Sequence, residues 1–371
     1  MITNEPLAGQ NGFSQKYPIP EDYDSDVRQS YKGGFTYLNP KYKEKEVGEG
    51  IVLDVNSLYP DVMYHCPLPF GEGIAFHGKY EHDKDYPLYV QMFRTPFKVK
   101  EGMLPTVQLK GNGLYVSNEY VTETKPGDEP VIVLTNVDLK LFREHYDFPE
   151  ELVEYMGGWK FQAYTGLFKA YIDKWMAVKE EATRTGNKAM RQLAKLMLNA
   201  LYGKFGTGTT ADYKKPQYID GVVNLSQREE DEKNPIYVPM ASFITAWARY
   251  KTINAAQNCY ERFIYADTDS LHLEGTEVPD GMDIDPVRLG AWDHEATFNR
   301  AKFLRQKCYI ESIVKDGKED IKVTCAGMPK SCHKYVTFEN FKIGAQYEGK
   351  LQPSHVHGGV VLKPVDFTIK P

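Results

Sequence analysis

The pattern of hydrophobic and polar positions is most informative around residues 264–273. An apolar run, Ile264–Ala266, leads into Asp267-Thr268-Asp269, and apolar positions then alternate with polar ones through Leu273. This pattern predicts a strand, a tight turn and a second strand. Two carboxylates therefore lie at the bend of a hairpin, although aspartate is also common in turns for backbone reasons alone.

A second apolar run predicts another strand that ends in a carboxylate. The run Gly50–Leu53 leads into Asp54, and a small-residue turn and an amphipathic stretch through Met63 follow. We expect Asp54 to lie at the end of its strand, where it can meet the carboxylates of the hairpin. Carboxylate oxygens on rigid elements suit Mg²⁺, which prefers a few carboxylates together with substrate phosphates.

A helical period runs through Lys195–Gly203. On a helical wheel Lys195, Asn199 and Tyr202 share one face. The opposite, apolar face is predicted to be buried and holds Leu193, Leu196, Met197, Ala200 and Leu201. Arg191 lies one turn before Lys195 and can add a second cation to the polar face; a solvated surface arginine is the alternative.

Other periodic stretches predict the surrounding elements. Helices are expected over Asn136–Tyr146, Leu167–Glu181 and Met240–Ala256, and strands over Tyr89–Phe93, Pro130–Leu134 and Phe303–Ile313. Asp220-Gly221 between two apolar runs is a strong two-residue hairpin signal. Lys307 and Tyr309 are two positions apart, so they are expected to share one face of the last strand.

Composition indicates an ordinary globular protein. The chain has 371 residues, of which 42% are hydrophobic and 26% charged. No run approaches the ~20 apolar residues that a membrane span needs and no signal peptide opens the chain, so we expect a cytoplasmic protein without a membrane segment. The five cysteines are scattered without Cys-x-x-Cys spacing, so neither a disulfide framework nor a zinc knuckle is indicated.

The charge is distributed unevenly along the chain. The net charge of −6 is unusual for a protein that holds nucleic acid, because phosphate contacts normally come from Lys and Arg. However, residues 300–371 carry thirteen Lys and Arg against seven Asp and Glu. This asymmetry favours a DNA-facing C-terminal portion, with an ordinary solvated surface as the alternative.

Three motifs occur in a fixed order. They are Asp-x-x-Ser-Leu-Tyr-Pro from Asp54, Lys-x-x-x-Asn-x-x-Tyr-Gly from Lys195, and Tyr-x-Asp-Thr-Asp-Ser from Tyr265. In this order they resemble motifs A, B and C of family B DNA polymerases. Tyr31-Lys32-Gly33-Gly34 and Lys307-Cys308-Tyr309 are similar to the protein-primed branch found in bacteriophages, and the resemblance runs from about Tyr31 to the C-terminus.

The resemblance implies an α+β fold shaped as a polymerase right hand. Its parts are a palm of antiparallel sheet plus helices, fingers helices, a small thumb and two family-specific insertions. The expected boundaries are an irregular lead-in at 1–30, palm at 31–63 and 240–330, first insertion at 64–162, fingers at 163–205, second insertion hairpin at 206–239 and thumb at 331–371.

The resemblance also implies an activity. It is DNA-templated addition of deoxynucleotides to a primer 3′-hydroxyl by two-metal nucleotidyl transfer, with protein-primed initiation and strand displacement. Two Mg²⁺ ions are the expected cofactors, with Mn²⁺ as an alternative. Only about thirty residues precede Tyr31, too few for the family's exonuclease domain, so we expect no proofreading activity in this chain.

The implied partners are template-primer DNA and deoxynucleoside triphosphates. A terminal priming protein and a separate exonuclease subunit are further partners that the resemblance suggests. The protein is expected to be a monomer, in the host cytoplasm if it is phage-encoded.

The resemblance assigns roles residue by residue. Catalysis and metal binding fall to Asp54, Asp267, Asp269 and the carbonyl of Val55. Nucleotide binding falls to Leu58, Tyr59, Lys179, Arg191, Lys195, Asn199 and Tyr202. DNA binding falls to Tyr31, Gly33, Gly34, Ser57, Gly203, Thr268, Lys307 and Tyr309. Tyr59 is expected beneath the sugar, where its ring collides with a 2′-hydroxyl; a core aromatic is the alternative.

Two other functions are compatible with the same fold. One is a palm enzyme that copies RNA, for which no distinguishing motif is present. The other is a catalytically inactive palm retained as a DNA- or protein-binding module. Degeneration typically removes the carboxylates first, and all three are present, which favours the polymerase.

Overall fold

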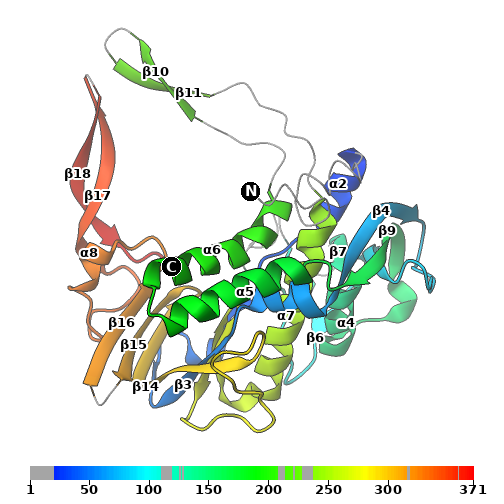
Figure 1. The fold of residues 1–371 in the computed structure, drawn as a ribbon, viewed down its shortest axis with the longest axis horizontal. Coiled ribbons are helices and arrows are strands. Elements are labelled where there is room, and N and C mark those ends of the chain that lie inside the picture. Colours follow the sequence, from blue (N-terminus) through cyan, green and yellow to red (C-terminus); the bar gives the residue numbers. More distant parts are fainter. Residues whose placement is uncertain are drawn as a thin grey trace.

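Two distant segments of the chain combine into one antiparallel sheet, seen in the lower part of Figure 1. In this computed structural model the sheet has eight strands in the order β1-β12-β13-β3-β14-β15-β16, and β2 pairs with β14. The strands are β1 (Thr36–Leu38), β2 (Glu46–Val47), β3 (Gly50–Val55), β12 (Phe263–Asp267), β13 (Ser270–Glu274), β14 (Trp292–Arg305), β15 (Cys308–Lys315) and β16 (Lys318–Cys325).

The structure describes most of the chain. The described ranges are 21–109, 119–124, 127, 129–207, 214–219, 222–227, 237–315, 318–357 and 359–371. Within these ranges no helix combines the length and the apolar character that crossing a membrane requires.

Helix α7 (Val238–Asn258) is the central helix of the molecule. It packs on the sheet at β12 and β13. It also contacts four helices, which are α2 (Glu21–Arg28), α3 (Leu58–His65), α4 (Asn136–His145) and α6 (Lys188–Phe205). Nearly every side chain of its first three turns is buried. A helix that is apolar on all sides belongs in a core, which confirms the predicted core helix at Met240–Ala256.

A second, four-stranded sheet lies on the other side of α7, at the right of Figure 1. Its order is β4-β9-β5-β7, formed by β4 (Pro67–Phe76), β5 (Leu88–Arg94), β7 (Ile132–Thr135) and β9 (Glu154–Thr165). Helix α4 (Asn136–His145) follows β7, and β6 (Lys98–Val99) pairs with β8 (Tyr146–Asp147). The strands predicted at residues 89–93 and 130–134 and the helix predicted from Asn136 are confirmed.

Helices α5 (Lys169–Arg184) and α6 (Lys188–Phe205) form an antiparallel pair that projects from the body. The predicted buried face of α6 is wrong in part, since Leu193 and Leu196 are 43% and 60% exposed. The buried residues of α6 are Ala194, Leu198, Leu201 and Phe205. Among the described residues, α6 contacts α5, α3 and α7, and the stripe that meets these helices is the part of α6 removed from water.

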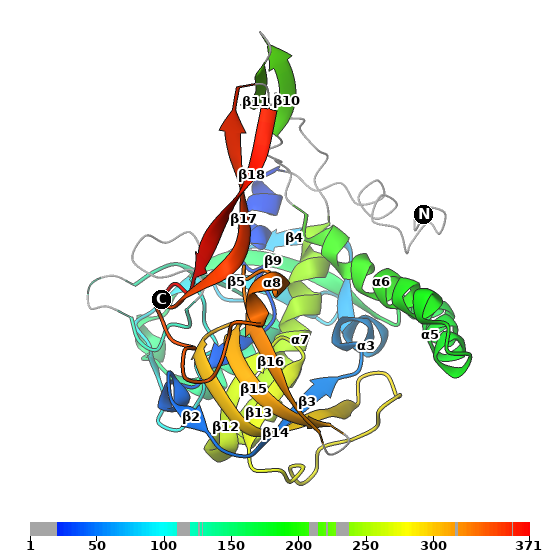
Figure 2. The same cartoon turned by 90° about the vertical axis from the view of Figure 1, so that its left-hand side faces the viewer.

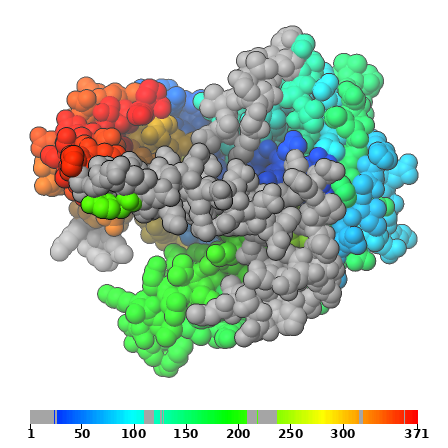
Figure 3. Space-filling view, turned by 90° about the horizontal axis from the view of Figure 1, so that it is seen from above, coloured from blue at the N-terminus to red at the C-terminus, as the bar shows by residue number. Residues whose placement is uncertain are grey.

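Two β-hairpins complete the chain. Strands β10 (Lys214–Ile219) and β11 (Val222–Gln227) form one, and β17 (Gln346–Val356) and β18 (Gly359–Thr368) form the other, after the short helix α8 (Lys330–His333). Strands β11 and β18 lie side by side (Figure 2). Seen from above, the C-terminal hairpin and the α5–α6 pair form separate projections (Figure 3). The hairpin predicted around Asp220-Gly221 has the expected strands, while these two turn residues lie outside the described ranges.

The irregular lead-in predicted for residues 1–30 is wrong from Glu21 onward. Helix α2 (Glu21–Arg28) occupies this stretch, whereas residues 1–20 lie outside the described ranges. Tyr23 and Val27 are one helical turn apart and both are buried, and Tyr23 packs on Trp159 at a ring distance of 4.5 Å. The helix is therefore stabilised by packing, which local polarity did not indicate.

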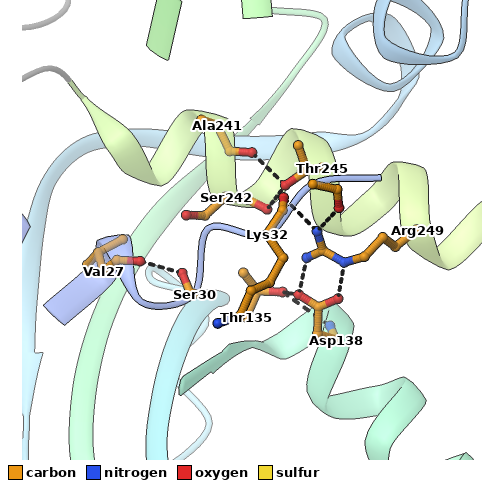
Figure 4. Close-up of polar contacts among 10 residues, drawn as sticks. Val27, Ser30, Lys32, Thr135, Asp138, Ala241, Ser242, Thr245 and Arg249 are labelled. Atoms are coloured by element: carbon orange, nitrogen blue, oxygen red, sulfur yellow. Dashed lines mark hydrogen bonds and ion pairs between the residues drawn. The ribbon is translucent and has the colours of Figure 1, made fainter. Parts of the chain in front are cut away.

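A buried arginine joins three parts of the fold (Figure 4). Arg249 on α7 donates two hydrogen bonds to the Asp138 carboxylate on α4, at 3.0 and 2.7 Å. Its Nη1 also donates to the backbone carbonyls of Lys32 and Gly33, at 2.9 and 2.7 Å. Arg249 is 2% exposed, so these partners replace the water that the charge has lost. The second sheet and the segment before β1 are thereby tied to α7.

Gly50 offers a test of the sheet packing around β3. A methyl group at residue 50 would overlap the Phe298 ring and lie 2.5 Å from the Leu273 carbonyl oxygen. We expect Gly50→Ala to lower the free energy of unfolding by about 1–3 kcal/mol, because the strands must separate to accept it. Urea unfolding followed by circular dichroism measures this loss. Gly48→Ala is the control, since nothing lies within 4 Å of its added methyl; equal stability of the two variants contradicts the packing.

Arg249→Met tests the buried ion pair. We expect it to lower the free energy of unfolding by about 3–5 kcal/mol, because Asp138 is left as a buried charge without its partner. Urea unfolding is again the measurement. The double variant Arg249→Met with Asp138→Leu should regain part of that loss, since it leaves no buried charge. A double variant no more stable than Arg249→Met would show that the unpaired charge is not the cause.

Candidate active site

A row of polar residues crosses one face of the large sheet at a single level. Adjacent pairs in the register are Thr36 with Asp267, Asp267 with Ser270, Ser270 with Asp54, and Asp54 with Asp293. Residues directly opposite each other on neighbouring strands project to the same side. The predicted placements of Asp54 at a strand end and of the two aspartates at a hairpin bend are confirmed.

The acids at this level act on one another in sequence: besides burial, the charge of Asp269 raises the pKa of Asp54, and the charge of Asp267 raises the pKa of Asp269. The Val55 N–H donates to the Asp269 carbonyl at 2.8 Å, which joins the end of β3 to the hairpin turn. Burial and then the charge of Asp269 raise the pKa of Asp54 to about 7. Burial likewise raises the pKa of Asp269. Two half-buried carboxylates of this kind need nearby positive charge to stay ionised.

The hairpin turn is held in an unusual backbone conformation. Thr268 has a φ of 63°, and its N–H donates to the Phe35 carbonyl at 2.7 Å. On α7, the Thr252 hydroxyl donates to the Thr268 carbonyl at 2.7 Å. A methyl group on Gly34 would lie 2.6 Å from the Thr268 side chain, so glycine permits this contact, whereas Gly33 faces open space.

Lys195 on α6 and Lys179 on α5 interact electrostatically with Asp54, and Arg191 on α6 interacts with Lys179. The charge of Lys195 lowers the pKa of both Asp54 and Asp269, which places it close to the pair. Burial and then the charges of Arg191 and Lys195 lower the pKa of Lys179. The Lys179 ammonium donates to the Ser57 hydroxyl at 3.1 Å, and Ser57 has a φ of 55°. The fold thus gathers positive charge beside the buried acids.

Aromatic side chains form the next part of the site. Tyr59 and Tyr202 stack with ring centroids 4.0 Å apart and an interplanar angle of 25°. Burial and then Tyr202 raise the pKa of Tyr31. Leu58 is only 1% exposed, so this residue packs in the core beneath the rings.

The remaining α6 residues of the predicted site are open to solvent. Asn199 and Gly203 are both exposed. A methyl group on Gly203 would meet nothing within 4 Å in the part of the chain that the structure describes. They lie on the same side of the helix as Lys195, as the helical period predicts.

Asp267 lies apart from Asp54, with a partner of its own. Its carboxylate accepts from the Lys307 ammonium at 2.6 Å and from the Thr36 hydroxyl at 3.2 Å. Asp267 and Asp54 are on strands two positions apart in the sheet, a backbone separation of about 9.5 Å. Among the residues that the structure describes, no three His, Cys, Asp or Glu side chains are grouped closely enough to hold a metal ion.

The shared strand face predicted for Lys307 and Tyr309 is wrong. Strand β14 ends at Arg305, and Lys307 lies in the turn with a φ of 54°, where its N–H donates to the Tyr265 hydroxyl at 2.9 Å. Tyr309 is 7% exposed and packs on Tyr265 and Phe303. Lys307 therefore faces the site, while the Tyr309 ring is part of the core.

Sequence reasoning missed two acidic neighbours of the site. Asp293 and Glu295 on β14 both contribute to the raised pKa of Asp54. The local signal was a short polar run, Asp293-His294-Glu295, between Trp292 and Ala296. Such a run does not indicate which strand it pairs with, and the pairing with β3 is what places these acids beside Asp54.

Comparison with known proteins identifies the family of this chain. A family model described as DNA polymerase type B, organellar and viral, matches residues 13–285. The DNA polymerases of Bacillus phages Nf and phi29 are each 52% identical to this chain over 96% of its length, and that of Streptococcus phage Cp-1 is 37% identical over 96%. This chain spans 64% of the length of the two Bacillus phage enzymes and 63% of the Cp-1 enzyme.

Solved structures agree with the sequence matches. The structure of phi29 DNA polymerase complexed with primer-template DNA and incoming nucleotide matches this chain with a TM-score of 0.92 and 48% sequence identity. The match covers 100% of this chain and 68% of the phi29 chain. The complex of phi29 DNA polymerase with single-stranded DNA gives a TM-score of 0.87. These matches confirm the predicted α+β class, and the chain belongs to the organellar and viral type B DNA polymerase family.

Proposed function

We propose that this chain is a DNA-templated DNA polymerase that adds deoxynucleotides to a primer 3′-hydroxyl. The observation that carries this function is the convergence of Asp54 and Asp269 beside Lys195. Buried acids next to a cluster of cations suit a reaction that brings a triphosphate and divalent cations together. The phi29 enzyme, in its complex with primer-template DNA and incoming nucleotide, has the same fold, which supports the same substrate class.

The donor set at the acids fits Mg²⁺. Asp54 and Asp269 supply carboxylate oxygens that burial and mutual repulsion leave poorly compensated, and the Val55 carbonyl is adjacent to them in the chain. Bound there, Mg²⁺ would supply the charge that activates the primer hydroxyl and stabilises the leaving oxygen. Because Asp267 is held by Lys307, we assign it an outer position, where it orients that lysine.

The cations and aromatic rings bind and orient the nucleotide. Lys195, Arg191 and Lys179 offset the charge of the triphosphate, and Lys179 is already positioned by Ser57. Tyr202 lies against the base, and Tyr59 lies beneath the sugar. Their stacking at 4.0 Å makes a rigid wall, which is what exclusion of a 2′-hydroxyl by collision requires.

The template and the duplex occupy the other surfaces of the site. Tyr31, Gly33 and Gly34 carry the template strand, since this segment is anchored by Arg249 and packs on the hairpin turn. Ser57, Gly203 and Thr268 adjoin it, and Lys307 serves the primer end, while the buried Tyr309 ring supports the strand beside it by packing on Tyr265. The large sheet acts as the palm, α5–α6 as the fingers, and the C-terminal hairpin as the thumb.

Protein-primed initiation and strand displacement extend this function. The segment 64–162 is proposed to contact a terminal priming protein, and the β10–β11 hairpin to close around DNA by its position beside β18. Both roles rest on the resemblance to protein-primed polymerases. We propose that residues 31–371 carry no proofreading activity and that a separate exonuclease subunit supplies it.

Primer extension with a metal titration tests this function against its alternatives. On a DNA template the protein should extend a DNA primer only when Mg²⁺ or Mn²⁺ is added. Extension on an RNA template with equal efficiency would favour an RNA-copying palm. DNA binding without any extension, across the whole titration, would favour an inactive binding module.

Asp54→Asn and Asp269→Asn test the acids separately. Each substitution keeps the shape and removes the charge, so each should lower primer extension by about 1,000-fold or more. Binding to template-primer DNA, measured by fluorescence anisotropy, should be retained. The control is Asp173→Asn, an exposed acid on α5. Full activity in both site variants would remove these acids from the mechanism.

Tyr59→Val tests the exclusion of ribonucleotides. Removing the ring opens the space beneath the sugar, so incorporation of ribonucleotides relative to deoxynucleotides should rise about 100-fold. Single-nucleotide incorporation with each triphosphate gives the two values of kcat/KM. Tyr59→Phe keeps the ring and should keep the preference. An unchanged sugar preference in Tyr59→Val would mean that the ring serves only to pack.

A further inference from the structure

Two cysteines face each other across the β15–β16 hairpin. Cys308 and Cys325 are direct partners in the strand register, and their sulfur atoms are 3.3 Å apart. Both are free thiols, at 0% and 8% exposure. A disulfide bond needs sulfur atoms ~2.05 Å apart, so a small rotation of the two side chains would bring them into bonding distance.

The backbone at this pair has the spacing that a disulfide needs. The Ala326 N–H donates to the Lys307 carbonyl at 2.8 Å, so the hydrogen-bonded pair is the one next to Cys308 and Cys325. The cysteines therefore occupy a non-hydrogen-bonded position, where Cα atoms are about 4.5 Å apart and side chains are closest. That separation lies within the range of about 4.4–6.8 Å found in disulfides.

The surroundings of the pair favour one reactive sulfur. A hydrogen bond from Cys308 and the charge of Arg305 lower the pKa of Cys325, and Cys325 is the more exposed of the two. A pocket of about 240 Å³ is lined in part by Arg305 and by Ala326, the residue that directly follows Cys325 in the chain. A small oxidant can approach here, whereas a bulky one is excluded by the burial of both thiols.

We propose that Cys308 and Cys325 are a reversible oxidation site. A hydroperoxide oxidises the two thiols, and they form a disulfide bond with each other across the strands. The Cys325 thiolate attacks one peroxide oxygen, so an S–O bond forms, the O–O bond breaks and hydroxide leaves. The Cys308 thiol then attacks the Cys325 sulfur, so the S–S bond forms and water leaves. Two thiols lose two electrons in total, and hydrogen peroxide is reduced to two waters.

The position of the pair gives this oxidation a structural effect. Cys308 directly follows Lys307, whose ammonium holds Asp267 and whose carbonyl accepts the Ala326 hydrogen bond. A disulfide here would join β15 to β16 at the end of the hairpin nearest the candidate active site. Amides of both strands should then exchange with solvent more slowly, because local separation of the strands is restrained.

Mass spectrometry of the whole chain tests this site. The reduced protein is desalted, treated with hydrogen peroxide at stoichiometric concentration, alkylated with iodoacetamide and digested. Before alkylation, we expect the oxidised protein to be ~2 Da lighter than the reduced protein. After alkylation and digestion, we expect a linked peptide pair containing Cys308 and Cys325, and three alkylated cysteines in place of five. Dithiothreitol should reverse all three changes. Hydrogen exchange of the oxidised form should show added protection in β15 and β16.

Matched variants separate this pair from the other thiols. Cys325→Ala should abolish the linked peptide, and Cys308→Ala should leave a sulfenic acid on Cys325 that dimedone labels. Cys332 lies in the same core cluster, and Cys332→Ala should leave the linkage unchanged. Five alkylatable cysteines after treatment, a sulfinic acid at Cys325 in the unaltered protein, or a link to Cys332 would each overturn the assignment.

Discussion

The register between β3 and β13 is the constraint on which the candidate site depends. Asp54 pairs with Ser270, and the hydrogen bond from the Val55 N–H to the Asp269 carbonyl follows from that pairing. Side chains alternate along a strand, so a slip of one residue would turn Asp54 to the other face of the sheet. The slip would also place the buried side chains of Leu53 and Val55 where Asp54 now lies. Burial on the core side therefore enforces the position of the acid.

Electrostatics explains why the site needs elements from three parts of the fold. Burial raises the pKa of Asp54 and Asp269, so the two acids alone would be unstable as a charged pair. The charge of Lys195 on α6 partly offsets this rise in pKa. Burial, together with the charges of Arg191 and Lys195, lowers the pKa of Lys179. The acidic side chains of the site are therefore close to one another, and so are the cationic side chains of α5 and α6. A bound triphosphate with divalent cations would offset both groups of like charges, which is why binding and chemistry can share this location.

Much of the fold could be predicted from local patterns, and the failures have a common cause. The hairpin around Thr268 and the strand ending at Asp54 were predictable because a period of two and turn residues are local signals. The exposure of Leu193 and Leu196, the helix around Tyr23 and the burial of Tyr309 were not, since each depends on what packs against the residue. Motif positions placed Asp54, Asp269 and Lys195 together, while the distance of Asp267 from Asp54 follows from strand order alone.

Helix α7 links the parts of the site that the sequence separates most widely. Arg249 holds the carbonyls of Lys32 and Gly33, and Thr252, three residues later, holds the carbonyl of Thr268. The Phe35 carbonyl in turn accepts a hydrogen bond from the Thr268 N–H, which links the same segment to the hairpin turn. Because Arg249 also binds Asp138, a shift of α4 would be transmitted to the segment that we assign to the template. Hydrogen bonds therefore connect α4, the segment before β1 and the hairpin that carries Asp269 to the same face of α7.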